Sequence, residues 1–446
     1  MVRIIVALTC ALVFASCAVQ SQEPAVPGDR ANGAMDPNRF HSPIKHVVIL
    51  VQENRTSDYL FQNVPGADIA KTAIDWHGHV VALKPMSLAA PYDLDHGHGA
   101  FVRDYDGGRM DGFDKALTQT QKQGGGPFRY APRSEVRPYL ALATQYVFAD
   151  RMFQSDQAGS FPSHQYLISG SSAALPLTPF DDSSDPFDKV TLEKGDAGCD
   201  ARKDVVVNTI NPHNGAPGPT PFPCFDRPVL SDFLDQRGVS WRYYQNHLGP
   251  GLWHAFDAIS HVRYGRDYAN VVTPPETVLA DARHGALAGV SWVMPADAKH
   301  SDHANSESAA GPSWVAAVVN AIGQGPEWNS TAIFITWDDW GGWYDHVSPH
   351  QYSNYFELGF RVPLVVVSPY AKKGYVSHVD HEFGSILAFC ERVFGISKGA
   401  LHSTDVRADA LMDAFDFTQS PRTFVRIVAH RFVPARDDGA ASAEDP

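Results

Sequence analysis

Residues 332–346 read Ala-Ile-Phe-Ile-Thr-Trp-Asp-Asp-Trp-Gly-Gly-Trp-Tyr-Asp-His. The stretch begins as an apolar run, which is typical of a strand buried on both faces of a sheet. It continues into two adjacent carboxylates, Asp338 and Asp339, and then into Gly341 and Gly342. Adjacent carboxylates at the end of a buried strand repel each other and lose solvation unless a cation or strong donors compensate them. The stretch therefore predicts a sheet strand that ends in a candidate metal site, and two acids that cap surface loops are the alternative.

Three further apolar runs predict strands of the same sheet, at residues 47–51, 290–294 and 362–367. Apolar residues also recur at three- and four-residue spacing, which predicts helices over residues 136–146, 229–236, 314–322 and 383–394. Buried strands that alternate with amphipathic helices predict an α/β fold, with a mainly parallel central sheet and helices on both faces. The Pro- and Gly-rich part from about residue 180 to 228 is expected to be a loop-rich insertion on this core.

The composition limits the classes of molecule that the protein is expected to bind. The 446 residues include 36 Lys and Arg against 50 Asp and Glu, a formal charge of −14, and 44% are hydrophobic, as in globular proteins. Such a charge argues against a nucleic-acid-binding surface or bulk electrostatic attraction to anionic lipid. An anionic substrate would need local positive charge in its site, for example from a metal ion.

The N-terminal segment predicts export. Residues 1–18 carry one positive charge and a short apolar run that ends in small residues, which is typical of a secretory signal peptide. Cleavage before Cys17, with a lipid anchor on that cysteine, is the alternative to cleavage after Ala18. No second apolar run has membrane-spanning length, so no transmembrane segment is expected in a periplasmic or extracellular protein. Residues 19–42 are expected to form a linker, 43–435 the folded domain and 436–446 a disordered acidic tail.

Two cysteines predict a disulfide. Cys199 and Cys224 both lie in polar, Pro- and Gly-rich stretches, and an oxidising compartment favours their pairing. Cys390 lies within an apolar helical pattern and is expected to be buried.

Oxygen ligands follow the first strand as well. Glu53 and Asn54 come directly after residues 47–51. Ligands of open α/β sheets bind beyond the carboxyl ends of the strands, so these two side chains are expected to share a cation with Asp338 and Asp339.

Ser160 is the candidate nucleophile. It stands in Gly159-Ser160-Phe161-Pro162, at the start of a predicted helix, where backbone N–H groups and the helix dipole favour an anionic phosphate. A helix cap is the alternative role for this serine, and Ser163 is the second candidate nucleophile.

Several histidines lie in polar or Gly-rich loops, where imidazole can hold a phosphate oxygen, protonate a leaving group or bind a metal. These are His96, His98, His303 and His346.

Six ordered motifs resemble the acid phosphatase A and bacterial phospholipase C phosphoesterases, a branch of the alkaline phosphatase superfamily. They are residues 44–55, 110–114, 159–162, 301–303, 336–346 and 361–363, and they span nearly the whole mature chain. The resemblance implies an alkaline-phosphatase-like fold. It also implies one divalent metal ion held by Glu53, Asn54, Asp338, Asp339 and Ser160, with Ca, Mg, Mn, Fe and Zn all open.

The resemblance further implies that Ser160 attacks phosphorus and forms a phosphoserine intermediate. His96, His303 and His346 are expected around the phosphoryl group, with His346 and His303 as the first candidates for the general acid. The nucleophile segment departs from the family pattern, since Ala158-Gly159-Ser160 stands where Gly-Pro-Ser or Gly-Pro-Thr is common.

The sequence thus predicts a secreted metal-dependent phosphoesterase acting on a phosphate ester. An acid phosphatase that hydrolyses phosphate monoesters is the first interpretation, because little chain follows residues 425–428 whereas resembling phospholipases often carry extra C-terminal domains. A phospholipase C that cleaves phosphatidylcholine-type diesters is the alternative, and a non-catalytic binding protein is a third. A sulfatase is disfavoured because His164 replaces the arginine of the formylglycine signal. The oligomeric state stays open.

Overall fold

The computed structural model describes residues 42–173, 187–191, 197–209, 218–351 and 358–434. The predicted signal peptide, the linker before Ser42 and the acidic tail lie outside these ranges.

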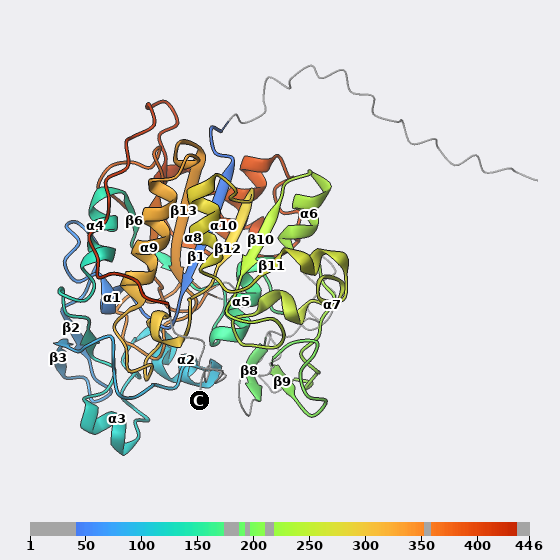
Figure 1. Ribbon diagram of the computed structural model, residues 1–446. Helices are drawn as coiled ribbons and strands as arrows, with labels where there is room; N and C mark the ends of the chain where they lie inside the picture. The colour runs from blue at the N-terminus through green and yellow to red at the C-terminus, as the bar shows by residue number, and fades with distance from the viewer. Residues whose placement is uncertain (1–41, 174–186, 192–196, 210–217, 352–357, 435–446) are drawn as a thin grey trace, which may run out of the picture. The chain divides into compact units, whose positions relative to one another are not determined.

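An eight-stranded sheet forms the centre of the described domain, in the order β11-β10-β12-β1-β13-β14-β6-β15 (Figure 1). Seven strands run parallel, and β14 runs antiparallel to both of its neighbours. The predicted mainly parallel α/β fold is therefore confirmed. The strands of this sheet are β1 (His46–Gln52), β6 (Val147–Ala149), β10 (Trp241–Tyr244), β11 (Val271–Val272), β12 (Val290–Val293), β13 (Thr331–Trp337), β14 (Leu364–Val367) and β15 (Tyr375–Ser377).

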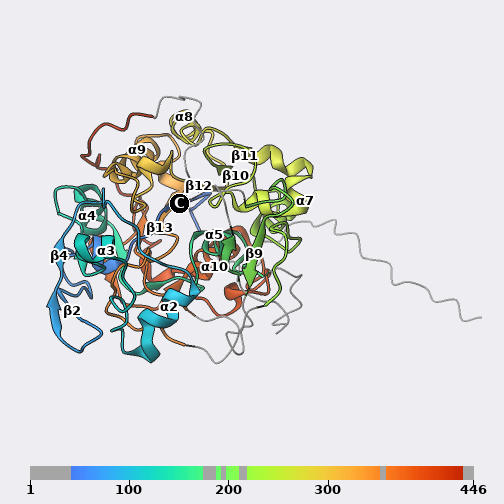
Figure 2. The same cartoon turned by 90° about the horizontal axis from the view of Figure 1, so that it is seen from below.

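Helices cover both faces of the sheet. In Figure 2, α4, α8 and α9 lie on one side of β12 and β13, and α5 and α10 lie on the other, where α6 also packs against α5. The four predicted helices are confirmed as α4, α6, α9 and α10. The helices are α1 (Ser57–Leu60), α2 (His98–Tyr105), α3 (Gln119–Gly124), α4 (Arg137–Gln145), α5 (Ser160–Ser169), α6 (Leu230–Gln236), α7 (Ser260–Arg263), α8 (Thr277–His284), α9 (Gly311–Gly323) and α10 (Phe383–Phe394).

Four short two-stranded sheets lie outside the central sheet in the described ranges. They pair β2 (Thr72–Ile74) with β3 (Val80–Ala82), β4 (Lys84–Pro85) with β5 (Arg129–Tyr130), β7 (Met152–Phe153) with β16 (His381–Glu382), and β8 (Phe187–Thr191) with β9 (Val206–Thr209). The last pair belongs to the predicted insertion, where Cys199 and Cys224 form the predicted disulfide. Cys390 is buried in α10, as predicted.

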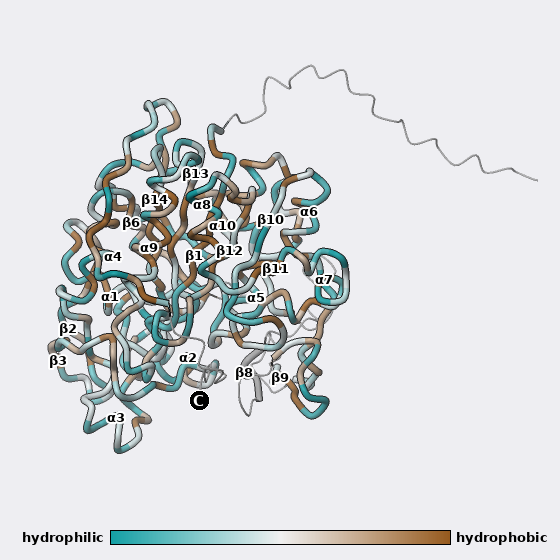
Figure 3. Tube along the Cα trace, viewed as in Figure 1, coloured by the Kyte–Doolittle hydropathy of each residue, from teal (hydrophilic) through white to brown (hydrophobic). Residues whose placement is uncertain are grey.

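The central strands are apolar along their whole length because both faces are covered. All seven residues of β13 and all but the first residue of β1 are buried, and the apolar colour in Figure 3 gathers along these strands and their neighbours. A smaller apolar cluster, which we call the satellite cluster, lies apart from this core; it comprises Ala73, Leu83, Ala100, Phe101, Met110, Phe113, Trp340, Tyr344 and Phe360. Within the described ranges, no helix is long and apolar enough to cross a bilayer.

Candidate active site

The site begins where two adjacent strands end. Gln52, the last residue of β1, is paired with Trp337, the last residue of β13. Asp338 N–H donates to Gln52 O at 3.0 Å, and Asn54 N–H donates to Asp338 Oδ1 at 2.9 Å. The register of the sheet therefore brings the Glu53-Asn54 pair and the Asp338-Asp339 pair together, and all four residues are buried.

The nucleophile candidate enters from a helix. Ser160 is the first residue of α5, after Gly159 as N-cap, and its Oγ lies 3.1 Å from Asp339 Oδ2 and 3.5 Å from the side-chain amide of Asn54. A Cβ at Gly159 would lie 3.3 Å from the His96 ring, a tight approach that favours glycine there. Ser160 is therefore held among the predicted metal ligands, with the N-terminal end of α5 behind it.

Ser163 has different surroundings. Its hydroxyl lies 3.3 Å from Asp156 Oδ2 and 3.2 Å from the Gln154 amide. These contacts hold the loop before α5, since Asp156 Oδ1 also accepts from Ala158 N–H at 3.0 Å. We therefore keep Ser160, and not Ser163, as the nucleophile candidate.

His164 belongs to the site although the sequence analysis did not assign it a role. It lies one turn after Ser160 on α5 and is fully buried, with Nε2 3.1 Å from Glu53 Oε1 and 3.6 Å from Asp338 Oδ2. The four-residue spacing from Ser160 puts both side chains on one face of the helix, and that spacing was the signal that could have identified it.

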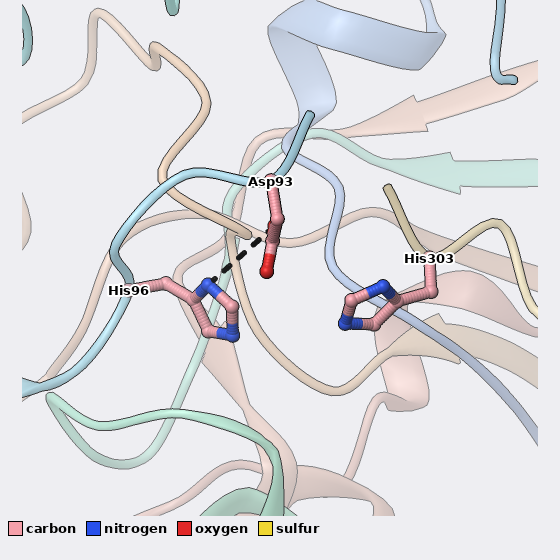
Figure 4. Close-up of side chains that lie close together, drawn as sticks. All are labelled: Asp93, His96 and His303. Atoms are coloured by element: carbon pink, nitrogen blue, oxygen red, sulfur yellow. Dashed lines mark ion pairs between the residues drawn. The ribbon is translucent and has the colours of Figure 1, made fainter. Parts of the chain in front are cut away.

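Two of the predicted histidines converge on Asn54. His96 Nε2 and His303 Nε2 lie 3.1 and 3.3 Å from the Asn54 amide. Figure 4 shows the two rings pointing toward each other from separate loops, with the side chain of Asp93, from the same loop as His96, between them and 4.0 Å from His96 Nδ1. The Nδ1 atoms of His96 and His303 are bound to the carbonyl oxygens of Leu94 and Ala304. These backbone contacts aim both Nε2 atoms into the site.

His98 lies beside this group at the start of α2, and its Nδ1 lies 3.3 Å from Gln157 O.

His346 does not join this group, which corrects its predicted place. Its Nδ1 lies 2.8 Å from Asp58 Oδ2 and its Nε2 lies 3.0 Å from Asp68 Oδ1. Asp58 and the neighbouring Asp345 also bind the buried Arg361. The physical reason is the turn at Gly341 and Gly342, whose φ angles of 62° and 70° redirect the chain after Asp339.

The electrostatics of the carboxylate pair favour a cation. Burial and the charge of Asp338 raise the pKa of Asp339. Burial opposes ionisation of Asp338 too, but the contact with His164 Nε2 at 3.6 Å and the charge of that imidazole lower the pKa of the Asp338 carboxyl. The pKa values of these two adjacent buried carboxyls are therefore shifted in opposite directions, as expected for like charges in contact.

The residues present fit a hard divalent cation. Asp338 Oδ2 is buried and makes no hydrogen bond, and the Asn54 amide lies 3.3 Å from Asp338 Oδ1 and 3.2 Å from Glu53 Oε2. Carboxylate, amide and hydroxyl oxygens from Glu53, Asn54, Asp338, Asp339 and Ser160 are a donor set that such cations take. Glu53, His164 and Asp338 also place one ligand atom each within 4.8 Å of the others.

Comparison with known families identifies the chain. Residues 44–397 match the Phosphoesterase family. The chain belongs to this family. The phosphoesterase is accordingly a hydrolase that acts on phosphoester bonds.

Curated relatives extend the comparison. This phosphoesterase is 25% identical over 470 residues to "Phospholipase C A" of Mycobacterium tuberculosis, covering 91% of this chain and 84% of that protein. It is 24% identical over 473 residues to "Non-specific phospholipase C1" of Arabidopsis thaliana, covering 93% and 78%. Among solved structures, a protein in the alkaline phosphatase superfamily from Vibrio parahaemolyticus is 10% identical, with a TM-score of 0.37 and coverage of 84% and 74%.

Proposed function

We propose that this phosphoesterase is a phospholipase C-type enzyme that cleaves zwitterionic glycerophospholipids into diacylglycerol and a phosphorylated headgroup. The observation that carries the proposal is the position of Ser160 Oγ, 3.1 Å from Asp339 at the N-terminal end of α5. The choice of a lipid diester is supported by the relatives named phospholipase C, which align over about nine-tenths of the chain.

Glu53, Asn54, Asp338, Asp339 and Ser160 would hold the divalent cation. When bound, it would lower the pKa of the Ser160 hydroxyl and balance the negative charge on the phosphoryl oxygens.

The residues of the chain perform the transfer. Ser160 Oγ passes its proton to Asp339 Oδ2, to which the hydroxyl donates at 3.1 Å, and attacks phosphorus while the bond from phosphorus to the glycerol oxygen breaks. His96 or His303, whose Nε2 atoms lie 3.1 and 3.3 Å from the Asn54 amide, gives a proton to the departing diacylglycerol oxygen. Water then attacks the phosphoryl-serine, which releases the headgroup phosphate and restores the Ser160 hydroxyl.

His164 has a supporting role in this proposal. Its imidazole contacts Glu53 and Asp338 from the side of α5, and it holds the two carboxylates in place before the cation and substrate arrive.

The disulfide bears on the compartment in which the enzyme acts. The Cys199–Cys224 bond supports an oxidising compartment, so we propose that the enzyme is exported. Anchoring through a lipid on Cys17 stays a prediction, since residues 1–41 lie outside the described ranges.

The experiment compares two chromogenic substrates, p-nitrophenylphosphorylcholine and p-nitrophenyl phosphate, with divalent metal supplied. The proposal expects faster hydrolysis of the diester, lost with a chelator and in Ser160→Ala but kept in Ser163→Ala as the matched control. Faster hydrolysis of the monoester would instead favour the acid phosphatase interpretation of the sequence. Undiminished turnover in Ser160→Ala would reject the assigned nucleophile.

A further inference from the structure

The β2–β3 hairpin exposes three large apolar side chains within seven residues. Ile74 is 38%, Trp76 48% and Val80 69% exposed. Trp76 is the exposed one of the nine tryptophans of the chain, and the other eight are all buried. Exposed apolar side chains that gather beside polar residues are typical of a surface that contacts a protein partner, a ligand or a membrane.

The hairpin presents these side chains from a fixed backbone. Asp75 Oδ1 accepts hydrogen bonds from the N–H groups of His77 and His79 at 3.0 and 2.8 Å, and Gly78 has the left-handed φ of 83° that the turn requires. Trp76 N–H donates to Asp114 Oδ1 at 3.0 Å, which ties the tip to the neighbouring loop. The hydrogen bond from His79 N–H lowers the pKa of Asp75, so its carboxylate stays ionised and is held within the turn, with His79 Nδ1 3.1 Å from Oδ2.

The base of the hairpin is packed against the loops of the active site. Ala73, on the face of β2 opposite Ile74, is buried in the satellite cluster, which also holds Trp340. Trp340 directly follows Asp338 and Asp339, and its ring centroid lies 6.3 Å from that of His96. Figure 1 shows the hairpin on the side of the sheet toward which the carboxyl end of β1 points. The exposed tip and the candidate active site thus share one side of the domain.

We propose that Ile74, Trp76 and Val80 dock the enzyme on its substrate bilayer by entering the boundary between headgroups and acyl chains. The inference rests on the proposed phospholipase C function, in which the scissile bond lies at such a boundary. Tryptophan favours this depth because its ring is apolar and its N–H is polar. The formal charge of −14 selects a zwitterionic bilayer over an anionic one.

A protein partner fits these observations less well. A stable protein interface buries roughly 800 Å² on each partner, and three side chains on a single turn supply only a fraction of that area. A bilayer needs no matching shape and gains affinity from each apolar side chain that enters it.

The test measures binding and catalysis separately. The Ser160→Ala protein, which cannot consume the lipid, is mixed with vesicles of phosphatidylcholine, and binding is followed by flotation and by quenching of tryptophan emission with brominated acyl chains. The probe variants are Trp76→Ser and the triple variant Ile74→Ser/Trp76→Ser/Val80→Ser. The matched control is Val428→Ser. Val428 is 70% exposed and follows Ile427, whose backbone forms hydrogen bonds with the Asn320 side chain near the C-terminal end of α9.

The proposal expects quenching that disappears in Trp76→Ser, and vesicle binding about 10-fold weaker or more in the triple variant. Val428→Ser is expected to bind like the parent protein. In proteins that retain Ser160, the triple substitution is expected to slow hydrolysis of vesicle lipid while leaving hydrolysis of soluble p-nitrophenylphosphorylcholine unchanged.

Vesicle binding that is unaffected by the triple substitution, or equally reduced by Val428→Ser, would overturn the docking role. A change of oligomeric state in the triple variant, without a change in vesicle binding, would assign the tip to a second copy of the chain and would also overturn it. Failure of the proposed function would look different, because the wild-type protein would then hydrolyse p-nitrophenyl phosphate faster than p-nitrophenylphosphorylcholine, or would hydrolyse neither.

Discussion

Replacement of His164 by alanine tests whether this histidine stabilises the carboxylates of the proposed metal site or only fills space in the core. The imidazole is fully buried and contacts two buried carboxylates, with Nε2 3.1 Å from Glu53 and 3.6 Å from Asp338. Removing one partner of a buried charged group costs about 3–5 kcal/mol, because the remaining charge is left uncompensated. We therefore expect His164→Ala to lower the free energy of unfolding by about that amount when a chelator keeps the site free of metal.

A bound cation should reduce this loss. It would balance the charge of Glu53 and Asp338 whether or not His164 is present, so at least half of the lost stability is expected to return with saturating divalent metal. The assay is urea unfolding of the parent and the variant, each with chelator and with metal.

His254→Ala is the matched control. His254 is also fully buried, but its ring nitrogens contact Asn246 and Gly249 O instead of the carboxylates of the site. Its loss of stability should be the same with chelator and with metal. An identical loss for His164→Ala under both conditions would refute the reasoning that this histidine and the cation stabilise the same carboxylates.

Three further predictions follow from other parts of the structure. Asp302 accepts from Tyr139 O–H at 2.6 Å and from Trp337 Nε1–H at 3.2 Å, which fixes the loop that carries His303; Asp302→Ala should lower kcat by about 10-fold with little change in KM, measured on the soluble diester. Burial lowers the pKa of His346, but the hydrogen bond to Asp58 and its charge raise it overall from 6.5 to about 9. Protonated His346 should therefore add up to about 3 kcal/mol to the free energy of unfolding below pH 6.5, and this stabilisation should be lost as pH rises through 9. His346→Gln should remove this pH dependence when the free energy of unfolding is measured across that range. Replacing Cys199 with serine opens a loop of sequence separation 25 and should cost about 3 kcal/mol, whereas a reductant should weaken the parent protein but not the variant.

The sequence predicted the layers of the fold because burial on both faces leaves a strong local signal. The uninterrupted apolar runs at residues 47–51 and 332–335 became β1 and β13, and the helical spacing at 383–394 became α10. The meeting of the Glu53-Asn54 and Asp338-Asp339 pairs was predictable for the same reason, since adjacent parallel strands end at one edge of the sheet, and their role as metal ligands stays a prediction.

What the sequence did not predict depends on turns and on helix faces. His346 follows Asp339 by seven residues and was grouped with it, but the left-handed turn at Gly341 and Gly342 carries it to Asp58 and Arg361. A Cβ at Gly341 would come within 2.3 Å of Asn54 O, so the close packing that makes this turn necessary comes from a segment far away in the chain. His164 was not predicted because Ser160 was assigned from its position at the start of the helix. The four-residue spacing that puts Ser160 and His164 on one face of α5 was not used.

The most direct test of the account is to identify the covalent intermediate. The enzyme is mixed with phosphatidylcholine vesicles and divalent metal and quenched in acid during turnover, and the peptide that contains Ser160 is analysed by mass spectrometry. The account predicts phosphocholine attached to Ser160, absent in Ser160→Ala and in chelated protein. A turnover-competent enzyme that carries no adduct, or carries it on another residue such as Ser163, would contradict the account.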